Sequence, residues 1–133
     1  LDWDKADDEL IGFVAQLAEF RRSHPALSDD HFLNGHKHHG VRDVIWLSAA
    51  GTEMQIDDWH DVRGCVLGVQ LNVENNQVLC WFNRDHVAHE VKCPPPHGEG
   101  RWSVGLVSSQ QSVSIDRHGV ANIPARSVVA LEY

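Results

Sequence analysis

The side chains best suited to chemistry in this sequence are its ten histidines, four of which fall within one nine-residue segment. His31, His36, His38 and His39 could bind a transition metal, because imidazole is a common ligand for such ions and an extended backbone would let His36 and His38 chelate. The segment is polar, flanked by glycines and interrupted by Lys37, as is typical of an exposed loop. We therefore predict a solvated loop here and no metal site.

The tryptophans are a second informative set, because an indole ring can stack on the apolar face of a sugar. Trp46 and Trp81 lie inside apolar runs and are predicted to be core residues. Trp59 lies in the acidic segment 56–61 and Trp3 precedes a helical pattern, so these two are the candidate carbohydrate contacts. Two alternatives stay open: Trp59 could instead pack back over the core as a lid, and Trp3 could be buried.

The three cysteines are predicted to be structural. Cys65, Cys80 and Cys93 are 13 to 15 positions apart, so no pair has the C-x-x-C spacing of a zinc or redox site. Cys65 and Cys80 lie in apolar runs, where a free cysteine behaves as a small hydrophobic residue. Free thiols point to a reducing compartment.

No sequence motif identifies a catalytic centre. The nucleophile elbow G-x-S-x-G, the phosphate-binding loop, the dinucleotide fingerprint G-x-G-x-x-G and the zinc motif H-E-x-x-H are all missing. Acidic residues occur mostly in surface-like runs at 7–9, 29–30 and 57–58, whereas acid–base catalysis needs a desolvated carboxylate in a cleft. We therefore predict no catalytic residue and no cofactor within this sequence.

The first element that would position any site is an N-terminal helix. Residues 4–23 show helical periodicity, with Asp4 as the expected N-cap and Pro25 ending the helix. The apolar positions recur every three or four residues on one face, at Leu10, Phe13, Val14, Leu17 and Phe20. This face must be buried against something, either the rest of the chain or a partner.

Beyond the loop-rich segment 28–40, the sequence consists of short β-type runs separated by turn residues. The run from Cys65 to Val73 alternates for a full strand, and Asn75–Asn76 is the expected hairpin turn. The predicted strands are 43–47, 65–73, 78–83, 89–93, 102–107, 112–115 and 127–132. About seven short strands at this spacing predict an antiparallel β-sandwich, and the fold class is therefore mainly β with one N-terminal amphipathic helix.

Composition narrows the function classes. The chain has 133 residues, with 11 Lys and Arg against 19 Asp and Glu, for a formal charge of -8. Such a chain is a poor candidate for binding nucleic acid or an anionic membrane, since both attract clustered positive charge. No apolar run approaches the roughly 20 residues of a membrane span, and no secretory leader is recognisable. We expect a soluble, cytoplasmic protein.

Several strings, in order along the chain, resemble glycogen debranching enzymes, the isoamylase-like, GlgX-type members of the α-amylase superfamily. The opening L-D-W-D and the later L-A-E-F-R-R-S-H-P-A-L at 17–27 are similar to the last helix of the family's (β/α)₈ barrel. The strings D-V-I-W-L (43–47), G-T-E-M (51–54) and D-D-W (57–59) are similar to the stretch after that helix. F-N-R-D-H (82–86) and P-A-R-S-V-V (124–129) resemble later strands, the last being common to many amylase-type domains.

The resemblance implies a carboxy-terminal piece of a hydrolase of α-1,6-glucosidic branch linkages. Residues 1–27 would be the last barrel helix, 28–40 a connecting loop and 41–133 the C-terminal β-sandwich. The family's catalytic carboxylates lie upstream of these motifs, so none is transferred to this chain. The implied partner is the barrel of the same enzyme, and glycogen or a maltooligosaccharide could make peripheral contact. Two alternatives remain: a stand-alone glucan-binding module, and a protein-interaction module that dimerises through its helix.

Overall fold

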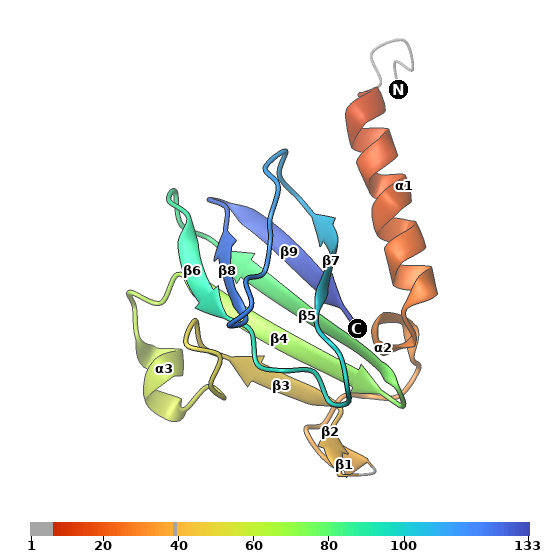
Figure 1. Cartoon of the computed structure of the whole chain (residues 1–133), viewed down its shortest axis with the longest axis vertical. Coiled ribbons are helices and arrows are strands. Elements are labelled where there is room, and N and C mark those ends of the chain that lie inside the picture. Colours follow the sequence, from red (N-terminus) through yellow and green to blue (C-terminus); the bar gives the residue numbers. More distant parts are fainter. Residues whose placement is uncertain (1–6, 39) are drawn as a thin grey trace.

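The computed structural model describes residues 7–38 and 40–133, and helices precede most of the β-structure (Figure 1). This confirms the prediction of a mainly β chain with an N-terminal helix. The helices are α1 (Asp8–Ser23), α2 (Pro25–Ser28) and α3 (Ile56–His60). The strands are β1 (Lys37–His38), β2 (Val41–Arg42), β3 (Val44–Leu47), β4 (Val66–Val73), β5 (Asn76–Asn83), β6 (His89–Lys92), β7 (Ser103–Val107), β8 (Val120–Ile123) and β9 (Ser127–Glu132).

In the described residues helix α1 begins at Asp8, later than the predicted start at residue 4. Asp7 is the N-cap, and its carboxylate accepts a hydrogen bond from the backbone N–H of Leu10 at 3.0 Å. The predicted N-cap, Asp4, lies outside the described residues, and Asp7 takes that role. The helix ends at Ser23 as predicted, because Pro25 starts the separate short helix α2 from its first position.

A five-stranded antiparallel sheet forms the centre of the molecule, in the order β3-β4-β5-β9-β7. Strands β4 and β5 form its longest hairpin. Val73 pairs with Asn76, so the two-residue turn is Glu74–Asn75, one position before the predicted turn. Glu74 takes the left-handed backbone conformation, with φ of 52°, which tight hairpins of this kind require.

Strands β6 and β8 form a second, two-stranded layer, which packs on one face of the large sheet. Both layers contribute to the main core, which includes Trp81 as predicted. Strand β8 was missed by the sequence prediction, and the strand predicted at 112–115 is wrong. Within that run only Ile115 makes an isolated bridge, to Ala121. The core residues are Leu47, Leu79, Trp81, Val91, Cys93, Trp102, Ala121, Ile123, Val129 and Leu131.

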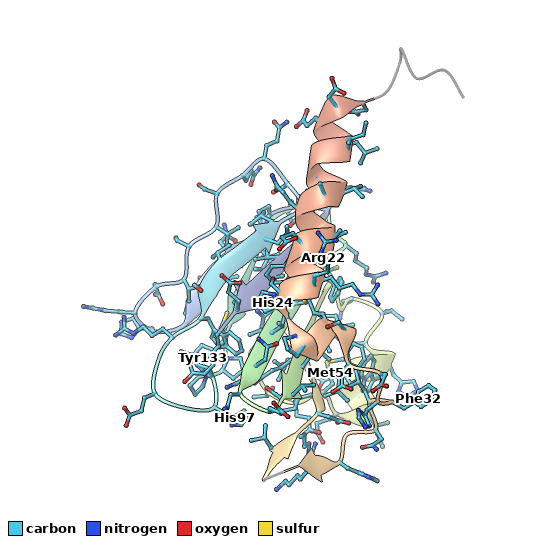
Figure 2. All side chains as sticks on the ribbon, turned by 90° about the vertical axis from the view of Figure 1, so that its right-hand side faces the viewer. Arg22, His24, Phe32, Met54, His97 and Tyr133 are labelled. Atoms are coloured by element: carbon cyan, nitrogen blue, oxygen red, sulfur yellow. The ribbon has the colours of Figure 1, made fainter. Side chains whose placement is uncertain are left out.

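The helices lie on the opposite face of the five-stranded sheet, which we call the outer face (Figures 1 and 2). Phe20 and Ala26 form a smaller core with Val78 of β5 and Ala130 of β9. Gly105 in β7 makes room for Phe20, since a Cβ there would collide with the Phe20 ring.

A histidine secures the same junction between helices and sheet. His24 is buried between α1 and α2, and its Nε2 lies 3.0 Å from Oε2 of Glu132 in β9 (Figure 2). Its Nδ1 is 2.7 Å from the carbonyl oxygen of Phe20. The buried contacts between helices and sheet thus lie at the C-terminal end of α1 and at α2, while Nε2 of Gln110, after β7, donates to Oε1 of Glu9 near the other end of α1 at 2.8 Å.

Candidate functional surface

The outer face of the sheet is apolar beyond the part that the helices cover. Trp46 of β3 stands in register with Val69 and Cys80, and one step along the sheet Phe82 of β5 stands in register with Leu67. Because alternate residues of a strand share a face, these side chains continue the row that starts at Val78. Trp46 and Phe82 are nevertheless 42% and 41% exposed. This part of the sheet has an apolar surface and no layer over it within the described residues.

The prediction that Trp46 belongs to the core is therefore wrong. Its strand is apolar on both sides, as the sequence shows, but β3 is an edge strand and its two faces have different neighbours. Leu47, which points to the other face, is buried in the main core. The apolar run indicates a strand with an apolar environment on each face, and the described residues provide only the one that surrounds Leu47.

Trp59 lies beside Trp46. It belongs to the short helix α3, whose start is fixed by a capping box between Gln55 and Asp58. The two indole rings have centroids 5.9 Å apart and planes at 72°, an edge-to-face contact. Trp59 remains 51% exposed, so it extends the apolar outer face. Trp3, the other candidate for sugar contact, lies outside the described residues.

Helix α1 adds a second apolar surface on the same side of the sheet. Leu10, Val14 and Leu17, which we call the apolar stripe, are exposed, with Val14 at 52%. In the described part of α1, only Phe20 is buried. The stripe comprises three of the five apolar residues of the predicted helical face; of the other two, Phe20 is buried and Phe13 is half-buried.

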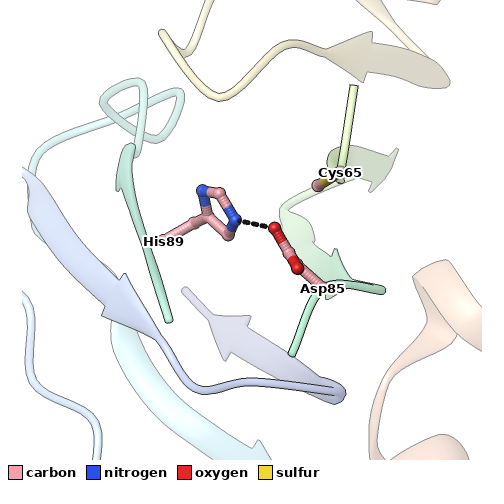
Figure 3. Close-up of side chains that lie close together, drawn as sticks. All are labelled: Cys65, Asp85 and His89. Carbon is pink, nitrogen blue, oxygen red and sulfur yellow. Dashed lines mark hydrogen bonds and ion pairs between the residues drawn. The ribbon is translucent and has the colours of Figure 1, made fainter. Parts of the chain in front are cut away.

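A separate polar cluster lies at the other end of the β4–β5 hairpin from its turn. Cys65 precedes β4, Asp85 follows β5, and His89 begins β6 (Figure 3). Oδ2 of Asp85 is 2.8 Å from Nε2 of His89, and the Sγ of Cys65 lies within 4.8 Å of ligand atoms of both. All three residues are half-buried.

The charge of Asp85 is stabilised by its surroundings. The hydrogen bond to His89, followed by the backbone N–H of His86, holds the pKa of Asp85 well below its ordinary value. The Cys65 thiol donates to the carbonyl oxygen of Arg63 at 3.1 Å. This arrangement of thiol, carboxylate and imidazole is what we call the Cys–Asp–His cluster, and it could hold a cation.

The sequence prediction missed this cluster, because Cys65 meets Asp85 only through the register of the β4–β5 hairpin. The hairpin register places Arg84 opposite Cys65, as the hydrogen bond from the Arg84 N–H to the Cys65 carbonyl at 3.0 Å confirms. Asp85 is the next residue, and His89 is four residues further on. Cys65 therefore could be placed near Asp85 only once the hairpin turn was fixed.

The other cysteines and the histidine-rich segment show different environments. Burial raises the pKa of the Cys80 thiol to about 11, which is consistent with the predicted structural role. His31 is exposed, with Nδ1 2.6 Å from a carboxylate oxygen of Asp29, and this hydrogen bond raises the pKa of His31. The side chains of His38 and His39 lie outside the described part, so the histidine loop stays a prediction.

No helix in the described parts of the chain has both the length and the apolar character needed to cross a membrane.

Comparison with known proteins confirms the resemblance to glycogen debranching enzymes. No family model matches the chain. The glycogen debranching enzyme of Cronobacter sakazakii is 30% identical over 101 residues, which are 76% of this chain and 14% of that protein. The glycogen operon protein GlgX homologue of Mycobacterium tuberculosis is 26% identical over 156 aligned positions, covering 98% of this chain and 21% of that protein. The chain thus spans only about a seventh to a fifth of the length of these relatives.

A solved structure shares the fold. The α-amylase from H. orenii superposes with a TM-score of 0.56 at 14% identity, over 97% of this chain and 21% of that one. At this identity the likeness concerns the fold alone.

Proposed function

We propose that this chain is a non-catalytic, C-terminal domain of a larger debranching enzyme that hydrolyses α-1,6-glucosidic branch linkages, and that it stabilises the catalytic barrel. The observation that carries the proposal is the apolar surface left uncovered on one side of the molecule, formed by the stripe on α1 and the outer face of the sheet around Trp46 and Phe82. Several exposed apolar side chains gathered on one helix and on one sheet face are typical of contact with another folded unit.

The size of the relatives favours a barrel domain as the occupant of this surface. The similar proteins are about five times as long as this chain, so a domain of this type occurs beside several hundred residues of other structure. Interfaces between domains of one protein bury roughly 600–1,500 Å². The helix stripe and the exposed part of the outer face offer two apolar contributions to such an interface.

The proposal divides the chain by role. Residues 1–27 would be the last barrel helix, 28–40 the connection and 41–133 the trailing β-sandwich. The attachment of α1 supports this division, because the helix contacts the sheet mainly through Phe20 and leaves its stripe for the barrel. The free cysteines of the described residues support a reducing, cytoplasmic location.

The test uses the gene product that contains this chain. Changing Val14→Asp or Phe82→Asp would place a charge in the proposed interface, so α-1,6-glucosidic hydrolysis should be lost at a lower temperature with KM little changed. Val87→Asp is the matched control, since Val87 is similarly exposed at 47% but lies in the β5–β6 connection. Equal loss in the control, or a reading frame with no barrel upstream of Leu1, would contradict the proposal.

The pair of Trp59 and Trp46 favours a second candidate function, peripheral contact with glucan. Both indoles are partly exposed on an edge strand and its neighbouring helix, where a chain of sugars could reach them. Because the two rings are nearly perpendicular, a single glucose unit could stack on the face of only one of them. The variant that tests this function is Trp59→Ala, because it removes the more exposed of the two rings.

A further inference from the structure

We propose that Cys65, Asp85 and His89 form a zinc site, which would join the start of β4 to the β5–β6 connection. The three donors come from three segments, and their ligand atoms lie within 4.8 Å of one another (Figure 3). Thiolate, imidazole and carboxylate are the donors that Zn²⁺ takes in proteins. The inference does not depend on the proposed function.

The backbone around the donors is firmly held, as a metal site requires. The N–H of Asp85 donates to Oδ1 of buried Asn83 at 2.9 Å, and the N–H of Arg126 donates to the Asp85 carbonyl at 2.9 Å. Cys65, directly before β4, is held by the backbone hydrogen bond from the Arg84 N–H. His89 begins β6, which pairs with β8. The donors therefore lie at or next to the ends of strands, where backbone hydrogen bonds hold them.

The charges suit a divalent ion. Asp85 supplies one carboxylate charge at neutral pH; its Oδ1 accepts a hydrogen bond from the backbone N–H of His86 at 2.7 Å, and its Oδ2 lies 2.8 Å from Nε2 of His89. A thiolate at Cys65 would bring the donor set to two negative charges, which a zinc ion neutralises. Zinc binds thiolate and unprotonated imidazole ligands, so metal binding at such a donor set weakens as the pH falls.

Space for the ion and a fourth ligand is present. A cavity of about 280 Å³ adjoins the cluster and is lined in part by Cys65, His89, Asp58 and Asp61. Asp58 already accepts from the Gln55 N–H, and Asp61 is paired with Arg63, so a water molecule would complete the tetrahedral shell. The Cys65 side chain would turn from its hydrogen bond with Arg63 toward the other two donors. The soft thiolate favours zinc over calcium or magnesium.

The alternative explanation is that Asp85 and His89, four residues apart, form an ion pair that only stabilises the β5–β6 connection. Such an ion pair does not require Cys65, whereas the zinc site does. The two explanations therefore differ in what the Cys65→Ser variant does to metal binding.

The experiment titrates the reduced chain with Co²⁺, which reports thiolate ligation by a charge-transfer absorption band, and then displaces it with Zn²⁺. We expect one cobalt ion per chain with this band, and tighter binding of zinc. Cys65→Ser should remove the band, and His89→Ala should weaken zinc binding by more than about tenfold, a loss typical even of substitutions that only support a metal ligand. Circular dichroism confirms that each variant is folded.

Two matched controls separate this site from other donors. His86→Ala removes a second imidazole beside Asp85, and His31→Ala removes the imidazole of the exposed group of Asp29, Asp30 and His31. Both variants should keep the band and the zinc affinity. Absence of the band in the unmodified chain, its survival in Cys65→Ser, or its loss in His31→Ala would overturn the proposal.

Discussion

At the scale of single residues, Asn83 fixes the geometry of the sandwich end. Its side chain is buried, and its Nδ2 donates to the carbonyl oxygens of Val87, Ile123 and Pro124 at 2.9, 3.1 and 2.9 Å. Asn83→Ala would leave these acceptors without that donor, and we expect a loss of about 2 kcal/mol in the free energy of unfolding. Denaturant unfolding measures it. The exposed Asn122→Ala should change stability by less than about 0.5 kcal/mol, and equal effects would contradict this role.

Asp85, two residues after Asn83, should make the free energy of unfolding depend on pH. Its pKa in the folded chain is lowered from the ordinary value of 3.8, chiefly by the hydrogen bond to His89. The folded state therefore binds fewer protons than the unfolded state in this range, and the stabilisation is complete above about pH 4 and is lost as pH falls through the folded pKa. Asp85→Asn should be less stable than the unmodified chain at pH 7 and approach it in acid. A difference that stays constant with pH would exclude this explanation.

Trp59 provides the residue-scale test of glucan contact. Trp59→Ala should abolish the change in tryptophan fluorescence that a maltooligosaccharide produces, because the exposed ring is the proposed stacking surface. Phe32→Ala is the control, since Phe32 is a fully exposed aromatic residue that stands away from the sheet (Figure 2). A chain that shows no response at millimolar sugar would rule out this second function.

At the scale of elements, some residues of α1 stabilise this chain itself, and others are free for the proposed contact with a barrel. Phe20 is the buried residue of its described part, whereas Val14 is half exposed. In the isolated chain, Phe20→Ala should cost about 3 kcal/mol, since a buried phenylalanine is truncated beside Gly105. Val14→Ala should change stability by less than about 0.5 kcal/mol. Hydrogen exchange of the α1 amides measures the docking directly, and similar effects of both substitutions would show that the stripe is already covered.

The helices and strands also show which parts of the structure could be predicted from the sequence. The 3.6-residue periodicity predicted α1, and strict alternation predicted β4, because each pattern depends on local geometry alone. Strand β8 escaped prediction because Val120–Ile123 is short and the strand it pairs with, β6, is distant in sequence. Trp46 and the Cys–Asp–His cluster depend on which layers and strands meet. Only the tertiary structure provides that information, so the fold class was predictable and the site was not.

At the scale of the whole molecule, the sandwich has one closed side and one open side. The closed side buries the main core between two sheets, and the open side carries the apolar stripe, Trp46, Trp59 and Phe82. The isolated chain should therefore bind an apolar fluorescent dye or associate with itself as its concentration rises, since these surfaces are attracted to one another in water. Analytical ultracentrifugation with dye titration measures both effects. The double variant Val14→Asp and Phe82→Asp should suppress them, whereas Val87→Asp should not. If the chain stays monomeric and binds no dye, exposing the open side to water has no measurable free-energy cost. The proposed contact with a barrel would then lose its physical basis.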